Sequence, residues 1–389
     1  MYTTLTEVDP FFQAGSFYGF STVLLPYGLT ADKLGPLLSH TSVDHLIAEA
    51  GSLDLDAVLT VNKSIKNIIW VTKPGSQHID WSSDAPKGFT ITSWQELVDN
   101  NRKSTTSEVL PLDKDSQVPP VSIFTPTSSG SYDLVKYASE NLISAVAAIL
   151  ATLPRIYKLS ASDTVLPTTS LTDSYSLSWA FAALYSHSTL ALNSVAGDGI
   201  KLDVAVSIVK PTVLIASPKA VTSFLSDPRT AKPSGLSKFN DTRSLQAGNL
   251  PATKRSVPSL PSLSTLRILL VPQNFITNTR PTPTLNSADL HALRLLLGAR
   301  VGYALTTPLV AGAVAQTNIL DYRDKGRDVI CYGAPLSSVE INLEGDEDVV
   351  GSTTPKGKLS VKGPAVVGGG KVTLDLNVQV DRDHTLILP

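Results

Sequence analysis

The sequence has a single cysteine, Cys331, which excludes an intramolecular disulfide framework and favours a reducing compartment. Cys331 follows Val329 and Ile330 in an apolar run, which is typical of a buried structural cysteine and not of a nucleophile. The six histidines are dispersed without metal-ligand spacing, and neither a Gly-x-Ser-x-Gly nor a His-x-x-x-His pattern occurs. The sequence therefore gives no support for a zinc site or a serine-hydrolase elbow.

Charge is also scarce, since only 17% of the residues are charged and the formal net charge is −2, so nothing favours nucleic acid as a partner. The longest apolar helical run, residues 142–153, is too short to span a bilayer, so no transmembrane segment is expected. The first ten residues lack the basic and apolar regions of a signal peptide, and the Leu-Ile-Leu-Pro ending is no retention or peroxisomal signal. A cytoplasmic location is expected, and peripheral attachment to the cytosolic face of a membrane stays open.

The chain has 389 residues, 42% of them hydrophobic, which is enough for one large domain or two ordinary ones. Short apolar strand patterns alternate with amphipathic helix patterns, which predicts an α/β fold of βαβ units with parallel-rich sheets. Residues 226–265 are rich in Ser, Pro, Lys and Arg and are expected to form a long surface loop. Strands are expected at 43–48, 65–72, 163–171, 188–192, 211–217 and 266–271, and helices at 30–39, 92–100, 140–153, 173–185, 200–209 and 289–297.

The stretch from Phe124 to Leu142, FTPTSSGSYDLVKYASENL, carries the clearest chemical pattern. Residues 121–124 are expected to form a short strand, followed by a loop of Thr, Pro, Ser and Gly and then a helix from about Leu134. A strand, a small-residue loop and a helix together make a phosphate-binding layout, because loop N–H groups and the positive end of the helix dipole face the anion. The alternative is an ordinary loop, which such clusters form more often.

This stretch resembles the phosphate loop of the adenylate-forming (AMP-binding) superfamily, the acyl-CoA synthetases and their relatives. That family's pattern is Tyr-Thr-Ser-Gly-Thr-Thr-Gly-x-Pro-Lys-Gly-Val followed by Ser/Thr-His-x-Asn-Leu. The fitting positions are Phe124, Thr125, Ser128, Ser129, Gly130, Val135, Asn141 and Leu142. Other family-like stretches follow in order: 299–308 for Tyr-Gly-x-Thr-Glu, 357–364 for Gly-Glu-Leu-x-x-x-Gly-Pro and 373–376 for Thr-Gly-Asp-Leu. The resemblance covers residues 17–389, with the long-chain acyl-CoA synthetases as the nearest branch.

The resemblance implies the large N-terminal domain of such a ligase, shortened at the front and without the small C-terminal domain. It implies one AMP-binding-like domain over 1–389, with α/β sub-parts at 11–225 and 266–328, the loop at 226–265 and a β-rich segment at 329–389. It also implies ATP or AMP with Mg²⁺ as cofactor. Nucleotide-binding residues carried over from the family are Thr125, Ser128, Ser129, Gly130 and Thr306 at the phosphates, Tyr303 at the adenine and Asp375 at the ribose.

Several positions depart from the family pattern. The phosphate-loop lysine is Asp133, the metal-binding glutamate is Thr307, and a histidine of a later motif is Asp173. The turn after the 266–271 strand is Pro-Gln-Asn and not the family's Gly-Ala-Ala type. Adenylation develops negative charge that needs cationic groups and Mg²⁺, so these departures predict a weak catalytic site and no residue is assigned a catalytic or metal-binding role.

Each retained residue also has a purely structural interpretation. Thr125 and Thr306 are equally suited to capping turns, Tyr303 to packing in a core, and Asp375 to a solvated strand end. Three hypotheses follow. The chain is a non-catalytic relative that binds an acyl or lipid ligand or partners an active synthetase; or it is an active ATP-dependent fatty acid–CoA ligase completed by a C-terminal domain or partner chain; or it is a truncated ligase. The first is preferred.

Overall fold

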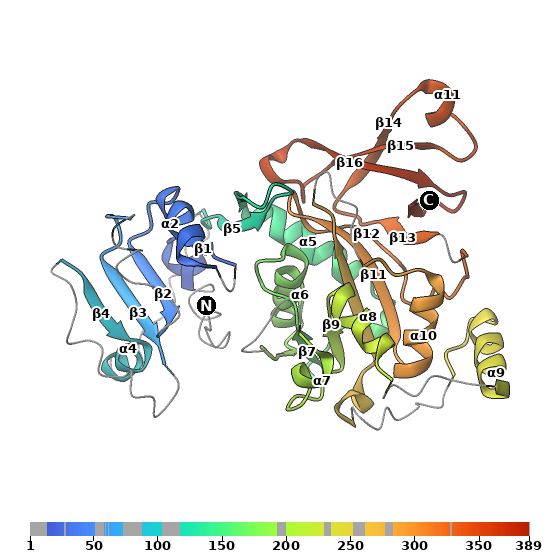
Figure 1. Ribbon diagram of the computed structural model, residues 1–389, viewed down its shortest axis with the longest axis horizontal. Helices are drawn as coiled ribbons and strands as arrows, with labels where there is room; N and C mark the ends of the chain where they lie inside the picture. The colour runs from blue at the N-terminus through green and yellow to red at the C-terminus, as the bar shows by residue number, and fades with distance from the viewer. Residues whose placement is uncertain are drawn as a thin grey trace. The chain divides into compact units, whose positions relative to one another are not determined.

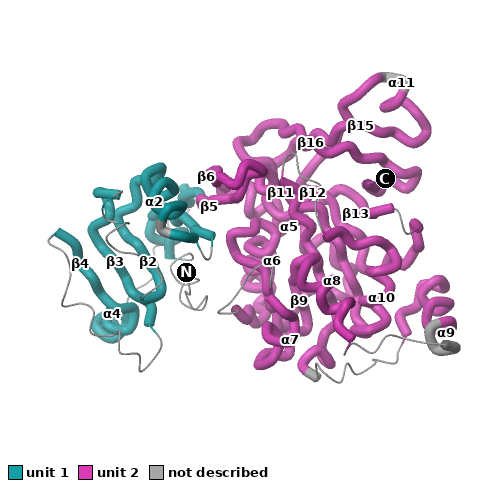
Figure 2. The backbone as a smooth tube through the Cα atoms, viewed as in Figure 1, with its two compact units in different colours: residues 1–120 teal, residues 121–389 magenta. Residues whose placement is uncertain are grey.

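The structure is a computed structural model that describes residues 14–26, 29–50, 58, 60, 62–72, 88–102, 117–192, 200–228, 235–251, 261–276, 283–326 and 329–388. The chain divides into two compact units, residues 1–120 and 121–389, coloured separately in Figure 2. Each unit has its own cluster of buried apolar side chains. The expected sub-parts divide at 225, 265 and 328 instead, and that finer division stays a prediction.

Unit 1 is built on a small parallel sheet in which β3 lies between β2 and β4. Apolar residues at helical spacing, Leu34 and Leu38, face a core that includes Ile68 and Trp70 of β3. Ser93 caps the helix that follows, because its hydroxyl accepts a 3.1 Å hydrogen bond from the Glu96 N–H. The elements are β1 (Thr22–Leu24), α2 (Ala31–Ser39), β2 (His45–Glu49), β3 (Asn67–Val71), β4 (Thr90–Ser93) and α4 (Trp94–Asn101).

Unit 2 contains an eleven-stranded sheet in the order β14-β15-β16-β17-β13-β12-β11-β10-β9-β7-β8 (Figure 1). Strands β8, β7, β9, β10 and β11 are parallel neighbours, and the pairings from β11 through β17 to β14 are antiparallel. This confirms the expected α/β class with a parallel-rich sheet and a β-rich segment after residue 329.

The strands of unit 2 are β5 (Val121–Pro126), β6 (Tyr132–Tyr137), β7 (Thr164–Pro167), β8 (Thr189–Leu190), β9 (Val213–Ile215), β10 (Ile268–Asn274), β11 (Arg300–Thr307), β12 (Val310–Gln316), β13 (Ile330–Pro335), β14 (Glu340–Glu344), β15 (Lys356–Lys362), β16 (Lys371–Val380) and β17 (Leu386–Leu388). Its helices are α5 (Ser139–Thr152), α6 (Ser174–Tyr185), α7 (Leu202–Ala205), α8 (Pro218–Ser226), α9 (Gly235–Gln246), α10 (Ser287–Leu297) and α11 (Glu347–Val350), with 3-10 helices η3 (Arg155–Tyr157), η4 (Pro261–Thr265) and η5 (Val367–Gly369).

The parallel strands are apolar on both faces, as a sheet covered by helices on both sides requires. Val213 and Ile215 of β9 pack in the cluster formed with α5 and α6, which includes Tyr175 and Trp179. Leu214, between them, is equally buried but points to the opposite face. Helices α8 and α10 contact β10 and β11 and supply cover on that side. The alternation therefore sandwiches the sheet between two helical layers.

A β-hairpin replaces the helix expected from about Leu134. β6 pairs antiparallel with β5 over six residue pairs, from Val121 opposite Tyr137 to Pro126 opposite Tyr132. The sequence YDLVKY has buried Val135 and Tyr137 two residues apart, which is strand periodicity. The expectation of a helix from Leu134 is therefore wrong, and α5 begins five residues later at Ser139.

The expected surface loop at 226–265 is also corrected, because α9 lies within it. Leu245 near the end of α9 is buried in a small cluster with Leu295 and Tyr322. The polar composition hid this helix, because its sequence shows little apolar periodicity and its buried Leu245 packs against residues that are distant in the sequence. No described helix has both the length and the apolar character needed to cross a bilayer.

Candidate functional site

The β5–β6 hairpin carries the residues that the resemblance assigns to phosphate. Its turn is closed by the Thr127 N–H, which donates to the Ser131 carbonyl at 2.9 Å, while Gly130 has a φ of +79° that only glycine adopts without strain. The hydroxyls of Thr127, Ser129 and Ser131 lie 2.7–2.9 Å from one another. Ser128, Ser129 and Gly130 are exposed. The turn is therefore a cluster of exposed hydroxyls whose donors can rotate toward an anion.

Asp133 places a carboxylate beside this turn. It is exposed on β6 directly opposite Thr125 of β5, and its backbone carbonyl accepts a 3.4 Å hydrogen bond from the buried Thr125 hydroxyl. The Thr125 side chain is thereby held within the hairpin. Position 133 contributes negative charge at the place where the resemblance expects a lysine.

Three segments that are far apart in the sequence meet at the hairpin. The Tyr137 hydroxyl donates to the Pro308 carbonyl at 2.6 Å, in the turn between β11 and β12. The Asn141 amide donates to the Pro364 carbonyl at 2.7 Å, and the Val367 N–H donates to the Leu309 carbonyl at 3.0 Å. Burial raises the pKa of Tyr137 well above its usual value, so its hydroxyl stays protonated and able to donate. The structure thus brings the family-like stretches at 124–142, 299–308 and 357–364 together.

Tyr303 of β11 lies inside the sheet-helix core. Its side chain is 0% exposed, and its hydroxyl donates to Gln273 Oε1 at 2.7 Å and accepts from the Leu285 N–H at 3.2 Å. Its ring stacks on Tyr332 with centroids 5.2 Å apart. Burial raises the pKa of Tyr303 well above its usual value. Neither face of this ring is exposed to solvent in the structure. The stacking of Tyr303 on an adenine stays a prediction.

Thr306 and Thr307 are the last two residues of β11, just before the β11–β12 turn that Tyr137 contacts. Thr306 is 1% exposed, and its Oγ1 has no hydrogen-bond partner among the described residues. A buried hydroxyl without a partner is unfavourable and marks a position where a bound group or water would be stabilised. Thr307 is 3% exposed and offers a neutral hydroxyl where the resemblance expects a carboxylate for Mg²⁺.

Asp375 lies apart from these residues. It is half exposed on β16, and its carboxylate forms a 2.8 Å ion pair with Lys358 of β15. Strands β17, β13 and β12 lie between β16 and β11 in the sheet order. At ~4.8 Å between neighbouring strands, the distance from β16 to β11 across the sheet is about 19 Å. The expected ribose role of Asp375 stays a prediction.

Other polar residues gather where the parallel strands end. Thr168 after β7 donates its hydroxyl to the Ile215 carbonyl at 2.9 Å, and Ser217 after β9 caps α8. Asp173 caps α6, accepting from the Ser176 N–H at 3.1 Å and its hydroxyl at 2.9 Å. Ligands of open α/β sheets bind at this carboxyl edge. Thr168, Ser217 and Tyr137 are not among the site residues expected from the sequence. The signals for them were the positions of Thr168 and Ser217 after apolar strand patterns and of Tyr137 two residues after Val135.

The donor set fits a nucleotide only in part. The hairpin hydroxyls and the orphaned Thr306 Oγ1 suit a phosphate, whereas Tyr303 is enclosed and Asp375 is paired with Lys358. Among the described residues, no group of three or more His, Cys, Asp and Glu side chains is placed to hold a metal ion.

Solved structures similar to this chain share its architecture. Anthranilate CoA ligase AuaEII in complex with anthranoyl-AMP superposes with a TM-score of 0.67 at 12% identity, covering 94% of this chain and 62% of that one. The N-terminal domain of FACL13 from Mycobacterium tuberculosis gives 0.59 at 12% identity, covering 94% and 80%. The chain has the fold of the CoA ligases. O-succinylbenzoate CoA synthetase (MenE) from Bacillus subtilis, in complex with ATP and magnesium, gives 0.62 at 14%, covering 98% and 66%.

The CoA-ligase fold confirms the resemblance at the level of architecture. No protein-family model and no curated protein sequence matches the chain. The chain spans 62% of the length of AuaEII and 66% of that of MenE. At these identities the side chains of the site, and not the fold, must carry any statement about activity.

Proposed function

We propose that this chain is a CoA-ligase-like protein with an impaired nucleotide site, which acts as a binding or scaffolding module for an acyl or lipid ligand or for an active synthetase. The observation that carries this proposal is Asp133, an exposed carboxylate on the strand that leaves the hydroxyl turn. The family relies on a cation at this point to hold the phosphates.

The charge at position 133 opposes a polyphosphate. Two unit charges ~6 Å apart at an effective dielectric constant of ~20 interact by about 3 kcal/mol. A lysine at position 133 would attract a phosphate by about that energy, whereas an aspartate repels it by about the same energy. Replacing lysine by aspartate therefore weakens phosphate binding by several orders of magnitude before salt screening is considered. Enclosed Tyr303, neutral Thr307 and the Asp375–Lys358 pair support the same conclusion.

Calorimetric titration with Mg-ATP tests the proposal. We expect no detectable heat at millimolar ATP for the unaltered chain, and binding at least tenfold tighter for Asp133→Lys, because the substitution turns repulsion into attraction. Asp346→Lys is the matched control, since Asp346 is an exposed carboxylate in the loop before α11. Micromolar binding by the unaltered chain, or an equal gain in both variants, would contradict an impaired phosphate site.

The second candidate is an active acid–CoA ligase, favoured by the exposed turn hydroxyls and the unpartnered Thr306 Oγ1. Adenylation forms a bond between a carboxylate oxygen and the α-phosphorus of ATP and breaks the bond to pyrophosphate. In that reaction the turn hydroxyls would bind the leaving phosphates, and Mg²⁺ would supply charge neutralisation. Carboxylate-dependent pyrophosphate release that Thr306→Val abolishes would support this candidate. Absence of release across short-, medium- and long-chain acids would remove it.

A further inference from the structure

Four of the most exposed apolar side chains in the described part of the chain gather at one edge of unit 2. Six described large apolar side chains are more than 60% exposed: Ile143, Ile156, Tyr185, Val204, Ile208 and Phe239. Four of them, the edge patch, are Ile156 in η3 (79%), Tyr185 at the end of α6 (75%), Val204 in α7 (64%) and Ile208 after α7 (93%). Scattered exposed apolar residues are ordinary, but a concentration in one place marks an interaction surface.

Hydrogen bonds place these four residues at the same edge of the sheet. Arg267, just before β10, donates to the Tyr157 carbonyl at 2.9 Å and pairs with Asp163, just before β7, at 2.8 Å. Ser188 and Thr265 extend the link. The Ser188 hydroxyl donates to the Ser160 carbonyl at 2.8 Å, and the Thr265 hydroxyl donates to the Pro211 carbonyl at 3.1 Å. The turns that carry the edge patch are thereby tied together where the parallel strands begin, opposite to the carboxyl edge with the hairpin.

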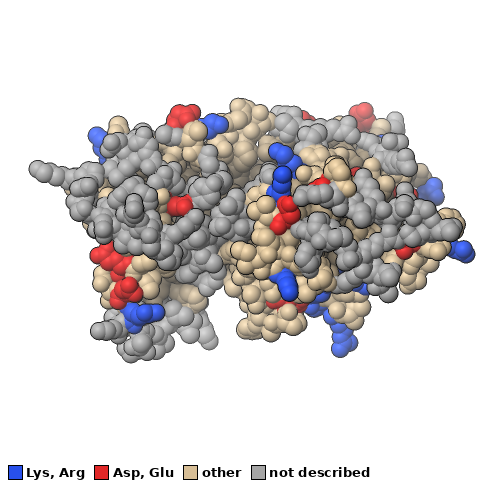
Figure 3. Space-filling view, turned by 60° about the horizontal axis from the view of Figure 1, so that its bottom comes forward, with Lys and Arg blue, Asp and Glu red and all other residues tan. Residues whose placement is uncertain are grey.

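Positive charge accompanies these apolar residues. The exposed cations next to them in the sequence are Arg155, Lys158, Lys201 and Lys210, whereas Asp203 is the only acidic residue in the described segments 155–158 and 200–210. Arg267 is already neutralised by Asp163. Figure 3, in which the side of α7 comes forward, shows blue Lys and Arg side chains together with a few red Asp and Glu side chains on a largely uncharged surface of unit 2. The described edge thus carries an excess of positive charge in a chain whose formal net charge is −2.

We propose that the edge patch binds the surface of a bilayer that contains anionic phospholipids. The apolar side chains belong to a 3-10 helix, a helix end and a short helix with its following turn, and each is more than 60% exposed, so they suit insertion among lipid headgroups. Lysine and arginine beside them are attracted to the negative surface potential, and tyrosine suits an interface that is wet on one side. Bound in this way, unit 2 leaves its carboxyl edge facing away from the bilayer.

Flotation with lipid vesicles tests the proposal on the full chain. Vesicles of phosphatidylcholine alone are compared with vesicles containing 30% phosphatidylserine, at low and at 0.5 M salt. We expect binding to the anionic vesicles only, and loss of that binding at high salt because the charges are screened. Each lysine near the surface contributes roughly fivefold to partitioning, so Lys158→Gln with Lys210→Gln should lower the partition coefficient by about 25-fold.

Ile208→Asp should lower partitioning more than tenfold, because it exchanges an inserted apolar group for a charge that the anionic surface repels. Ile143→Asp is the matched control, an isoleucine 68% exposed at the opposite end of α5 from Ile156, and should bind as the unaltered chain does. No binding to anionic vesicles, or equal losses in Ile208→Asp and Ile143→Asp, would overturn the proposal. Light scattering that reveals a dimer dissociated by Ile208→Asp would assign the patch to a second copy and overturn it as well.

Discussion

Tyr303 has a structural role that its hydroxyl reveals. It donates to Gln273 Oε1 at 2.7 Å and accepts from the Leu285 N–H at 3.2 Å, and all of its surroundings are buried. A buried amide oxygen and a buried N–H therefore depend on one phenolic oxygen. If the phenolic oxygen is removed, both groups stay buried without a hydrogen-bond partner, because water cannot reach them. The free-energy cost of leaving them unpaired exceeds the net contribution of the two hydrogen bonds to stability.

We expect Tyr303→Phe to lower the free energy of unfolding by about 1–3 kcal/mol, measured by urea denaturation. Tyr185→Phe is the control, since that side chain is 75% exposed and its hydroxyl can bond to water, and it should change stability by less than about 0.5 kcal/mol. If both variants were equally stable, the buried network around Tyr303 would not be a source of stability.

At the scale of single elements, caps explain some departures from the family pattern. Asp173 stands at the position of a family histidine, and its carboxylate accepts two hydrogen bonds from Ser176 at the first turn of α6. An acidic N-cap also faces the positive end of the helix dipole. Capping of α6 therefore accounts for an acidic residue at position 173.

Asp173→Ala is expected to lower the free energy of unfolding by about 1 kcal/mol, because α6 loses its cap. Asp173→His, the family residue, should cost a similar amount and should produce no nucleotide binding. Asp173→Asn keeps an acceptor oxygen and serves as the control, with only a small change. Thermal unfolding of the three variants decides the matter: an alanine variant as stable as the asparagine variant would argue against the capping role.

The hairpin at β5–β6 shows how elements reorganise a motif. The sequence pattern predicted that a helix would follow the small-residue loop directly, whereas the six residues of β6 lie between the turn and α5. Helix α5 consequently begins at Ser139, eight residues after Ser131, the last of the three turn residues with clustered hydroxyls. Phosphate binding at the turn would therefore rest on hydroxyls and not on a helix N-terminus.

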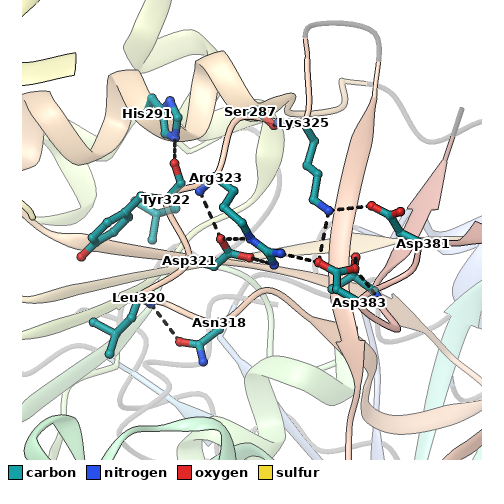
Figure 4. Close-up of polar contacts among 12 residues, drawn as sticks. Ser287, His291, Asn318, Leu320, Asp321, Tyr322, Arg323, Lys325, Asp381 and Asp383 are labelled. Atoms are coloured by element: carbon teal, nitrogen blue, oxygen red, sulfur yellow. Dashed lines mark hydrogen bonds and ion pairs between the residues drawn. The ribbon is translucent and has the colours of Figure 1, made fainter. Parts of the chain in front are cut away.

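At the scale of the whole of unit 2, an ionic network ties the segment after β12 to the β16–β17 turn (Figure 4). Lys325 Nζ lies 2.6 Å from Asp381 and 3.2 Å from Asp383, and Arg323 bonds Asp383 and Asp321. Burial alone would raise the pKa of Asp383, but hydrogen bonds from the Thr385 hydroxyl and the Lys325 ammonium outweigh it and hold that pKa well below its usual range.

This network predicts a loss of stability in acid. Because the folded-state pKa of Asp383 is depressed, its contribution is complete above the unfolded-state value of about 3.9 and is lost as the pH falls toward the folded-state value. We expect Asp383→Asn to lose about 1 kcal/mol less than the unaltered chain between pH 7 and pH 3, measured by urea denaturation at each pH, because a single carboxylate with an unfolded-state pKa of about 3.9 changes stability by no more than about 1.3 kcal/mol over that interval. Asp346→Asn is the control. An identical pH dependence for Asp383→Asn would contradict the role of this carboxylate.

The sequence by itself determined the elements whose cause is local. Ser93 and Asp173 satisfy N–H groups within one turn, so α4 and α6 begin where the pattern places them. The apolar runs that end at Pro167, Ile215 and Val271 likewise lie in parallel strands, because a continuous apolar run suits a sheet buried on both faces.

Only the tertiary structure decided the fate of the candidate site residues. Thr125 faces Asp133 across a hairpin, Tyr303 is enclosed by Gln273 and Tyr332, and Asp375 pairs with Lys358. Each of these depends on strand register or on a residue brought from elsewhere in the chain, and a shift of one residue would reverse which face a side chain occupies. Residues close in the sequence decide where a helix or strand begins. The burial and the hydrogen-bond partners of a side chain are decided by residues that are close in space but distant in the sequence.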